Sequence, residues 1–277
     1  MSRRAPRIVK SNGEIEGFKE SKLRASLRRA GANGAEERQI VAAVRLSLRD
    51  GMTTGELYRI AHRMLRRARR PAAARYSLQK ALQELGPGGY PFEQFVGELW
   101  RAEGWRVRVG ARLRGHLVSH EVDVVATRPR GPKRGRELAE CKFRNRADGK
   151  VDVTVAMYIY GRACDLEQTR ESWSSFWLVT NGRFTSDALA YGEGMGLQLL
   201  AWDHPAGDSL RERVDRARLH PITALTHLRV RDKRALLNRG IVLCRQLRRR
   251  PRLLDELDLP DRRRRQIANE AAALTEE

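Results

Sequence analysis

Two short segments of this 277-residue chain place acidic side chains and a lysine at alternating positions. Asp123 follows Glu121 by two residues, and Lys142 follows Glu140 by two residues. Side chains two residues apart share one face of a β-strand, so two neighbouring strands would bring Asp123, Glu140 and Lys142 to one point. The residues that alternate with them are apolar and are expected on the opposite faces of the two strands. They are Val122, Val124, Ala139, Cys141 and Phe143.

This set of side chains fits the hydrolysis of a phosphodiester. Asp123 and Glu140 can hold a hard divalent cation, Mg²⁺ or Mn²⁺, which stabilises transition-state charge and lowers the pKa of a bound water. A lysine beside the cation can orient or deprotonate that water. Lysine accounts for 8 of the 55 basic residues, so composition alone seldom puts one at this spacing. The alternative from spacing is two ordinary half-buried strands with solvated polar faces.

Hydrophobic periodicity predicts the elements that would position these residues. Apolar side chains at spacings of three and four predict an amphipathic helix over residues 92–100. The order that follows predicts a compact α/β core. Its expected elements are strands at 105–109, 121–127 and 137–143, a helix at 157–166, a strand at 176–180, a helix at 186–194 and a strand at 197–202.

The α/β core is expected between two mainly helical modules. Two prolines and three glycines within residues 86–91 interrupt any helix and mark the first boundary. The first module opens with an extended stretch and an Asn-Gly turn, followed by helical patterns. The predicted divisions are an N-terminal module over 1–86, the core domain over 91–203 and a C-terminal module over 209–277.

The charge of the chain favours a polyanionic partner. The net charge is +21, and a preference for arginine over lysine does not explain an excess of base over acid. Residues 1–90 hold 20 basic and 8 acidic residues, residues 91–203 hold 17 and 15, and residues 204–277 hold 18 and 11. DNA is therefore the expected partner, gripped mainly by the flanking modules; a merely soluble basic surface is the alternative.

Four segments of the core follow one another as FEQFVGELWRAEGWRV, HEVDVVA, ELAECKF and FWLVTNGRFTSDALAYGEGMGLQLLAW. They resemble the Mrr-type restriction endonuclease domain of the PD-(D/E)XK superfamily over about residues 91–203. The resemblance implies a restriction-endonuclease-like α/β fold, with a mixed sheet flanked by helices, and a metal-dependent DNA endonuclease. It implies that Asp123 and Glu140 are metal ligands and that Lys142 is the catalytic lysine. Glu93 matches the first-helix glutamate that supports such a site.

The N-terminal module resembles the ATP-cone domain, a nucleotide-sensing module of ribonucleotide reductases and their transcriptional repressors. The resemblance is carried by the run from Ile8 to Gly13, with Lys10 and Asn12, and by Lys22. It implies that these three residues contact ATP or dATP, and lysines suit phosphates as compact charges. The chain has Lys-Ser-Asn-Gly where the family usually has Lys-Arg-Asp-Gly. The alternative is a basic helical DNA-binding module that holds no nucleotide.

Other positions leave two interpretations open. Residues 232–241, with Gly240 at a turn, are vaguely similar to a helix-hairpin-helix, and the C-terminal module is otherwise a basic helical bundle contacting phosphate. His120 is either a contact for DNA or a metal-bound water, or a surface histidine. Arg162 either reaches a phosphate or lies on a solvated helix face. Thr180 and Asn181 either line the site or form a turn.

The function expected from the sequence is a metal-dependent DNA endonuclease, regulated by ATP or dATP, in defence against foreign DNA or in DNA repair. The alternative is a nucleotide-responsive DNA-binding regulator with an inactive nuclease fold. Double-strand cutting would need two sites, which favours a homodimer. No apolar run approaches the roughly 18 residues of a membrane span, and three scattered cysteines favour free thiols in the cytoplasm.

Overall fold

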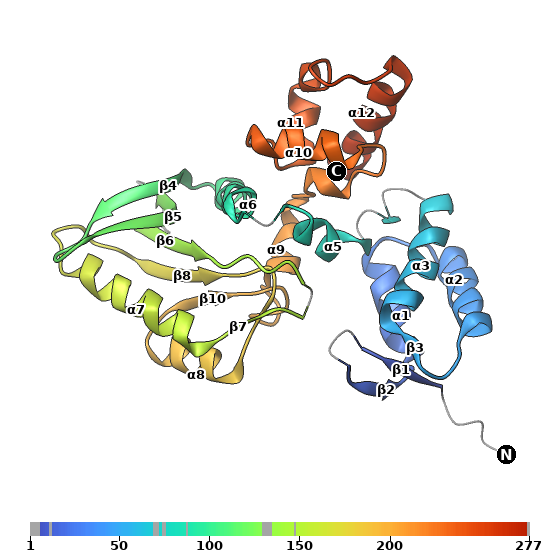
Figure 1. Cartoon of the computed structure of the whole chain (residues 1–277), viewed down its shortest axis with the longest axis horizontal. Coiled ribbons are helices and arrows are strands. Elements are labelled where there is room, and N and C mark those ends of the chain that lie inside the picture. The colour runs from blue at the N-terminus through green and yellow to red at the C-terminus, as the bar shows by residue number, and fades with distance from the viewer. Residues whose placement is uncertain are drawn as a thin grey trace.

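The computed structural model describes residues 6–10, 13–68, 72–73, 76–86, 88–128, 135–146 and 148–275. The N-terminal module lies at one end of the long axis and the α/β core at the other (Figure 1). The C-terminal helices lie beside the segment that joins these two parts. No helix in these ranges is long and apolar enough to cross a membrane.

The N-terminal module is a small sheet covered by helices that enclose a core of their own. The backbone of Lys10 bonds that of Glu14 to close the predicted hairpin. Asn33 caps the second helix through a reciprocal capping box with Glu36. Asn12 lies outside the described residues. The elements are β1 (Arg7–Val9), β2 (Ile15–Gly17), β3 (Met52–Thr53), α1 (Glu20–Arg29), α2 (Gly34–Ser47) and α3 (Thr54–Ala68).

The core is built on a five-stranded mixed sheet of order β10-β8-β6-β5-β4. The β4–β5 and β5–β6 pairs are antiparallel, whereas β6–β8 and β8–β10 are parallel. A separate parallel pair, β7 with β9, is not predicted from the sequence, because each strand has only two residues. The strands are β4 (Arg106–Arg114), β5 (Ser119–Arg128), β6 (Gly135–Cys141), β7 (Lys150–Val151), β8 (Ser175–Val179), β9 (Arg183–Phe184) and β10 (Gln198–Leu200).

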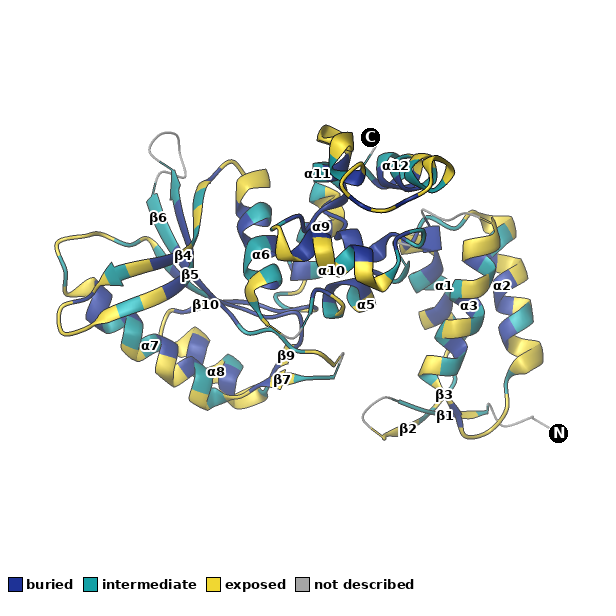
Figure 2. Cartoon of the chain, turned by 45° about the horizontal axis from the view of Figure 1, so that its top comes forward, coloured by how far each residue is buried: buried dark blue, intermediate teal, exposed yellow. Residues whose placement is uncertain are grey.

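Helices cover both faces of this sheet, so its central strands are buried (Figure 2). α6 (Tyr90–Ala102) packs on one face, and α7 (Val153–Glu167) and α8 (Ser186–Gly194) pack on the other. Pro91 stands in the first turn of α6, where its missing N–H costs nothing. A Cβ on Gly97 would lie 2.8 Å from Val109, so glycine allows the close approach of α6 to β4.

The C-terminal helices and α5 share one hydrophobic core with α6 and its face of the sheet. Thr223 Oγ donates to the Ala81 carbonyl of α5 at 2.6 Å, and Arg245 reaches Glu98 of α6 at 2.6 Å. Gly240 takes a left-handed φ of +71° at the predicted turn. The elements are α5 (Leu78–Gln83), α9 (Leu210–Ala217), α10 (Val230–Asn238), α11 (Cys244–Arg249), α12 (Asp261–Thr275) and two short 3-10 helices, η1 (Ile222–Ala224) and η2 (Pro251–Leu254).

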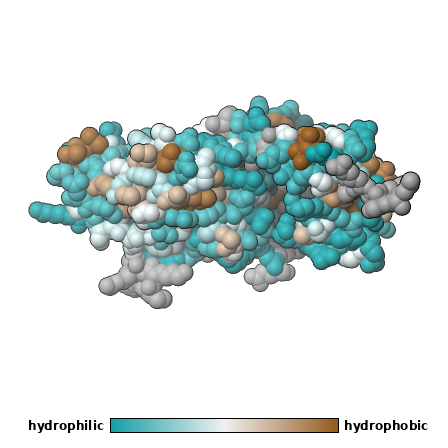
Figure 3. Space-filling model, turned by 90° about the horizontal axis from the view of Figure 1, so that it is seen from below, coloured by the Kyte–Doolittle hydropathy of each residue, from teal (hydrophilic) through white to brown (hydrophobic). Residues whose placement is uncertain are grey.

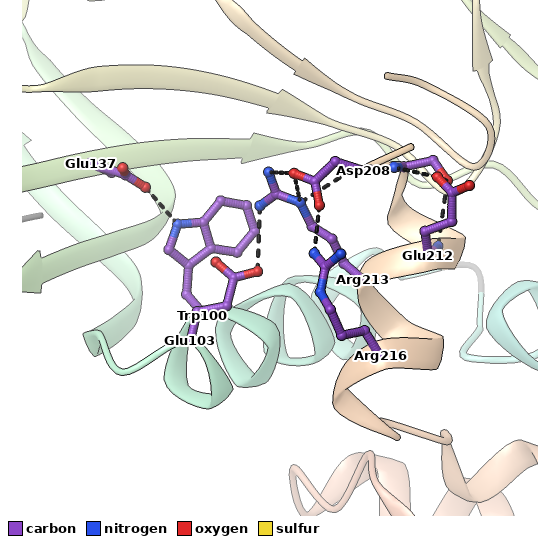
Figure 4. Close-up of polar contacts among 8 residues, drawn as sticks. Trp100, Glu103, Glu137, Asp208, Glu212, Arg213 and Arg216 are labelled. Atoms are coloured by element: carbon purple, nitrogen blue, oxygen red, sulfur yellow. Dashed lines mark hydrogen bonds and ion pairs between the residues drawn. The ribbon is translucent and has the colours of Figure 1, made fainter. Parts of the chain in front are cut away.

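Helix α9 is braced against the sheet by a polar cluster (Figure 4). Arg213 Nη2 bonds Asp208 at 2.6 Å, and its guanidinium lies 5.0 Å from the centre of the Trp177 ring on β8. Trp100 of α6 donates its indole N–H to Glu137 of β6 at 2.8 Å. These contacts tie α9, α6 and two central strands into one unit.

The face of the molecule shown in Figure 3 is mostly hydrophilic, with apolar side chains in separate spots. Large apolar side chains that reach the surface include Leu117, Met157 and Tyr158. Isolated apolar residues are normal on a protein surface.

Candidate active site

Strands β5 and β6 part at Asp123. Their antiparallel pairing runs from Arg128–Gly135 to Val124–Ala139. The next free amide of β6, that of Cys141, donates to Asp123 Oδ2 at 2.7 Å instead of to the backbone of β5. β6 continues beside β8, and the backbone N–H of Lys142 donates to the Val179 carbonyl at 2.7 Å. The two strands therefore separate beside Asp123 and Glu140, the two residues predicted from the sequence as metal ligands.

The strict alternation predicted along β5 is wrong at this point. Val122 packs in the core under α7, whereas Val124 packs in the core under α6. Gly110, which lies opposite Asp123 in the β4–β5 register, has a φ of +66°. Glycine permits this left-handed conformation. At this point the side chains of the β4–β5 hairpin change from one face of the sheet to the other. Asp123 therefore sits at the change of face, between the two helical layers.

Glu140 is held by two cations. Lys142 Nζ donates to Glu140 Oε1 at 2.7 Å, and Arg162 Nη1 donates to the other carboxylate oxygen. Arg162 also donates to the Glu121 carbonyl at 2.8 Å and to the Tyr158 hydroxyl at 2.9 Å. Arg162 is therefore part of the site and does not lie on a merely solvated helix face. Lys142 follows the last residue of β6, one position beyond the regular strand.

Crowded carboxylates give the site its electrostatic character. Burial, with the charge of Glu140, raises the pKa of Asp123 to about 6, against the hydrogen bond from Cys141. Burial, followed by the charges of Asp123 and Glu140, raises the pKa of Glu93 on α6 to about 7. The structure thus brings Asp123, Glu140 and Lys142 together at the ends of β5 and β6. Glu93 lies near enough for the charges of Asp123 and Glu140 to raise its pKa.

The donor types at this site fit a hard divalent cation. The negative charges of Glu93, Asp123 and Glu140 repel one another, and a bound cation would relieve this repulsion. Carboxylate oxygens are the ligands that such a cation prefers. In the described ranges, however, no three His, Cys, Asp or Glu side chains are gathered closely enough to form a metal cluster. Both oxygens of Glu140 are turned to Lys142 and Arg162, so metal binding would exchange at least one of these contacts.

Thr180 and Asn181 hold the segment that carries Lys142. The Thr180 hydroxyl donates to the Lys142 carbonyl at 2.7 Å. The Asn181 carboxamide accepts from the Arg144 amide and donates to the Arg144 carbonyl, both at 2.7 Å. Both side chains are buried. The sequence left a turn or a site lining open here, and these side chains position the chain after β6.

His120 does not face the carboxylate cluster. Its Nε2 lies 2.7 Å from Asp165 Oδ2 on α7. Asp165 also accepts from the Leu117 amide at 2.7 Å and the Val118 amide at 3.3 Å. The His120–Asp165 pair therefore fixes the β4–β5 hairpin against α7.

The two lysines expected to contact a nucleotide share an acidic neighbour. Lys10 lies 3.1 Å from Glu14 and 3.3 Å from Glu16, and Lys22 lies 3.1 Å from Glu16. Lys10 lines a pocket of about 830 Å³, whereas Lys22 stands away from its lining. A role of Lys10, Asn12 and Lys22 in nucleotide binding stays a prediction.

Comparisons with known protein families agree with this architecture. Residues 87–206 match the restriction endonuclease family model, and residues 6–84 match the ATP cone domain. Residues 220–275 match the C-terminal domain of AF1548-like proteins. Both resemblances inferred from the sequence and the restriction-endonuclease-like α/β fold are therefore confirmed. The chain thus joins a segment similar to restriction endonucleases to a segment similar to the ATP cone domain.

One protein sequence and two solved structures are similar to parts of this chain. An uncharacterized protein of Archaeoglobus fulgidus is 29% identical over 153 residues, which are 55% of this chain and 83% of that protein. The crystal structure of AF1548, a protein of unknown function, has 27% identity and a TM-score of 0.56, covering 67% of this chain and 97% of that one. The MspJI restriction endonuclease with a 27-mer oligonucleotide has 19% identity and a TM-score of 0.37, covering 61% of this chain and 36% of that one.

Proposed function

We propose that this protein is a metal-dependent DNA endonuclease whose active site is the open end of β5 and β6. The observation that carries the proposal is that Asp123, Glu140 and Lys142 meet where these strands part, with Glu93 near enough for its pKa to respond to both carboxylates. The convergence lies within the segment that matches the restriction endonuclease family. Metal-assisted hydrolysis of a phosphodiester uses carboxylates that hold the metal ion and a lysine beside them that can act on the attacking water.

Asp123 and Glu140 would hold Mg²⁺ or Mn²⁺. When bound, such a cation supplies charge stabilisation at the phosphate and acidifies a coordinated water. Asp123 is already oriented, because the Cys141 amide fixes one of its oxygens. Glu140 is pulled toward the same point by Lys142.

Lys142 and Glu93 would orient the attacking water and transfer its proton. Lys142 can release Glu140, orient the attacking water and neutralise developing negative charge at the phosphate. Glu93 has a pKa near neutrality, so its carboxyl can accept or return a proton at working pH. Arg162 stands beside them with a fixed guanidinium that suits a phosphate oxygen.

Both flanking modules would bind DNA, and the N-terminal module would respond to ATP or dATP. Residues 1–90 and 204–277 hold most of the excess positive charge, which favours phosphate backbones. A homodimer would supply two active sites for cutting both strands. Defence against foreign DNA or DNA repair is the corresponding role.

Cleavage assays test this function. Plasmid and branched DNA are incubated with Mg²⁺ or Mn²⁺ and with wild type, Asp123→Ala or Lys142→Ala. We expect cleavage by wild type alone, with about 100-fold or greater loss in either variant. Equal activity of the three proteins would exclude this active site.

One observation favours a second function, a nucleotide-responsive DNA-binding regulator. Lys142 and Arg162 occupy both carboxylate oxygens of Glu140, which is how an inactive site would be closed. Tight, salt-dependent DNA binding without cleavage in any divalent cation would support the regulator.

A further inference from the structure

The β4–β5 hairpin continues beyond the candidate active site as a two-stranded ribbon, residues 111–122. It reaches the end of the core farthest from the N-terminal module (Figure 1). One face of the ribbon packs in the core under α7 through Leu113 and Val122. The other face is exposed, and it begins beside Asp123. A surface that starts at the active site and leads away from it is placed to contact a bound substrate.

Two arginines stand on this exposed face. Arg112 and Arg114 alternate with Leu113, so they point away from α7. Neither side chain forms a hydrogen bond or an ion pair with another residue that the structure describes. Glu121, the one carboxylate of the ribbon, lies opposite Arg112, at the end nearer the active site. The half of the ribbon nearer the tip is therefore cationic, and its arginines are available for a partner.

The spacing of these arginines fits a DNA strand. A β-strand rises about 3.3 Å per residue, so Arg112 and Arg114 lie about 7 Å and about 13 Å beyond Gly110, which stands opposite Asp123. A DNA strand has one phosphate about every 3.4 Å along the helix axis. The two arginines therefore come level with phosphates about two and about four nucleotides from the active site.

Asp165 of α7 holds the tip of the ribbon in one conformation. Its backbone carbonyl accepts from the His116 amide at 3.0 Å, and its carboxylate accepts from the Leu117 amide at 2.7 Å. The Gly115 amide donates to the Val118 carbonyl at 2.8 Å. A Cβ on Gly115 would lie 2.0 Å from Asp165 Oδ2, so glycine allows the tip to close onto Asp165.

This fixed tip presents two adjacent apolar side chains to solvent. Leu117 is 69% exposed and Val118 is 54% exposed. Exposed apolar surface is unfavourable in water, and a loop that is already fixed loses little freedom when it binds. Apolar side chains of DNA-binding proteins enter between base steps and partly unstack them, while cationic side chains hold the backbone. The arginines behind the tip favour DNA as the partner that covers Leu117 and Val118.

We propose that the β4–β5 hairpin is a wedge that opens a base step of DNA close to the cleavage site. Leu117 and Val118 enter the base stack, and Arg112 and Arg114 hold the phosphates between the wedge and the active site. The preferred substrate is then duplex DNA in which a step is easily opened, at a mismatch or a branch point. This inference rests on the proposed nuclease function and adds the class of DNA that the site selects.

DNA binding in EDTA tests the wedge without any cleavage. Fluorescence anisotropy compares two duplexes of one sequence, one fully paired and one with a central mismatch. We expect wild type to bind the mismatched duplex about 10-fold more tightly, because a mismatched step is easier to unstack. The double variant Leu117→Ser, Val118→Ser should bind both duplexes alike. Leu46→Ser, which changes a leucine that is 90% exposed on α2, is the matched control and should keep the preference.

The arginines have a separate readout. Arg112→Gln and Arg114→Gln should each weaken binding to both duplexes and make the plot of log affinity against log salt shallower by about 1. Arg106→Gln removes the same charge from the exposed start of β4, before the change of face at Gly110, and is the control. It should keep the wild-type salt dependence. Salt slopes of Arg112→Gln and Arg114→Gln equal to that of wild type would exclude the phosphate contacts.

A fluorescent adenine analogue beside the mismatch reports unstacking directly. Its emission should rise when wild type binds and should stay low with the double variant, whose folding is checked by circular dichroism. An equal mismatch preference in wild type and the double variant would overturn the wedge, even if wild type cleaves DNA. Loss of the preference in the double variant would support the wedge, even if no cleavage were found. If the double variant instead turned a dimer into a monomer in sedimentation without DNA, the tip would be a subunit contact and the proposal would fail.

Discussion

The backbone N–H of Cys141 donates to Oδ2 of Asp123 at 2.7 Å, so a side chain of β5 takes the place of a backbone acceptor of β5. This one bond does two things. It ends the β5–β6 ladder, and it fixes the Asp123 carboxylate beside Glu140. The opening of the sheet and the orientation of the proposed metal ligand therefore have the same cause.

Replacing Asp123 separates these two roles. Asp123→Asn keeps an oxygen that can accept from Cys141, whereas Asp123→Ala leaves that amide without its acceptor. We expect the alanine variant to be less stable than the asparagine variant by about 1–3 kcal/mol, measured by urea unfolding. Cleavage should be lost in both, since neither retains the carboxylate. Equal stability of the two variants would mean that the bond does not hold the strand end.

Asn181 is expected to act by positioning Lys142. Asn181→Ala removes both bonds to the Arg144 backbone and should cost about 2–4 kcal/mol of unfolding free energy. DNA binding should survive while the maximal cleavage rate falls, because Lys142 loses its support. Asn181→Asp keeps the acceptor for the Arg144 amide but sets a buried carboxylate oxygen against the Arg144 carbonyl, so we expect it to be at least as destabilised as Asn181→Ala at neutral pH. A variant with normal stability and normal cleavage would contradict this role.

Substitutions of Arg162 and Tyr158 test whether the contact between Arg162 and Glu140 matters for cleavage. Arg162→Ala removes the bonds to Glu140 and to the Glu121 carbonyl, so cleavage should fall about 10-fold or more. Tyr158→Phe removes one hydroxyl contact and keeps the ring, which lies 5.1 Å from the guanidinium carbon. Its activity should stay close to wild type. Single-turnover cleavage measures both, and similar losses would place the hydroxyl in the site as well.

The carboxylate cluster should make the metal-free protein less stable as pH rises. In the folded chain the pKa of Glu93 is raised to about 7 and that of Asp123 to about 6, from ordinary values of 4.5 and 3.8. A carboxyl with a raised pKa stabilises the fold below its unfolded value and loses this contribution as pH rises through the folded value. Thermal unfolding in EDTA should therefore show a fall in Tm between pH about 4 and about 7 from this cluster.

Glu93→Gln provides the control for that pH profile. The amide mimics the protonated carboxyl, so the variant should have a higher Tm than wild type near pH about 8 and a shallower pH dependence. Added Mg²⁺ should raise the Tm of wild type at the same pH, because a cation relieves the repulsion. A wild-type profile identical to that of Glu93→Gln would show that the cluster does not control stability.

The sequence by itself determined the elements and the residues that could do chemistry. The helix predicted at 186–194 has those bounds as α8, and the strands and helices of the core follow the predicted order. Periodicity is local, so these elements could be found without contacts. The scarcity of lysine singled out Lys142, and the order of short motifs carried the family resemblance that the comparisons confirm.

The tertiary structure alone decided how these residues meet. The change of face at Asp123 depends on Gly110 of the neighbouring strand, which no pattern within β5 reveals. Arg162 joins Glu140 from a helix 22 residues away, and the Asn181 clamp lies 37 residues from Arg144. Contacts between distant segments follow from packing, and packing is not written in the spacing of side chains along one strand or helix.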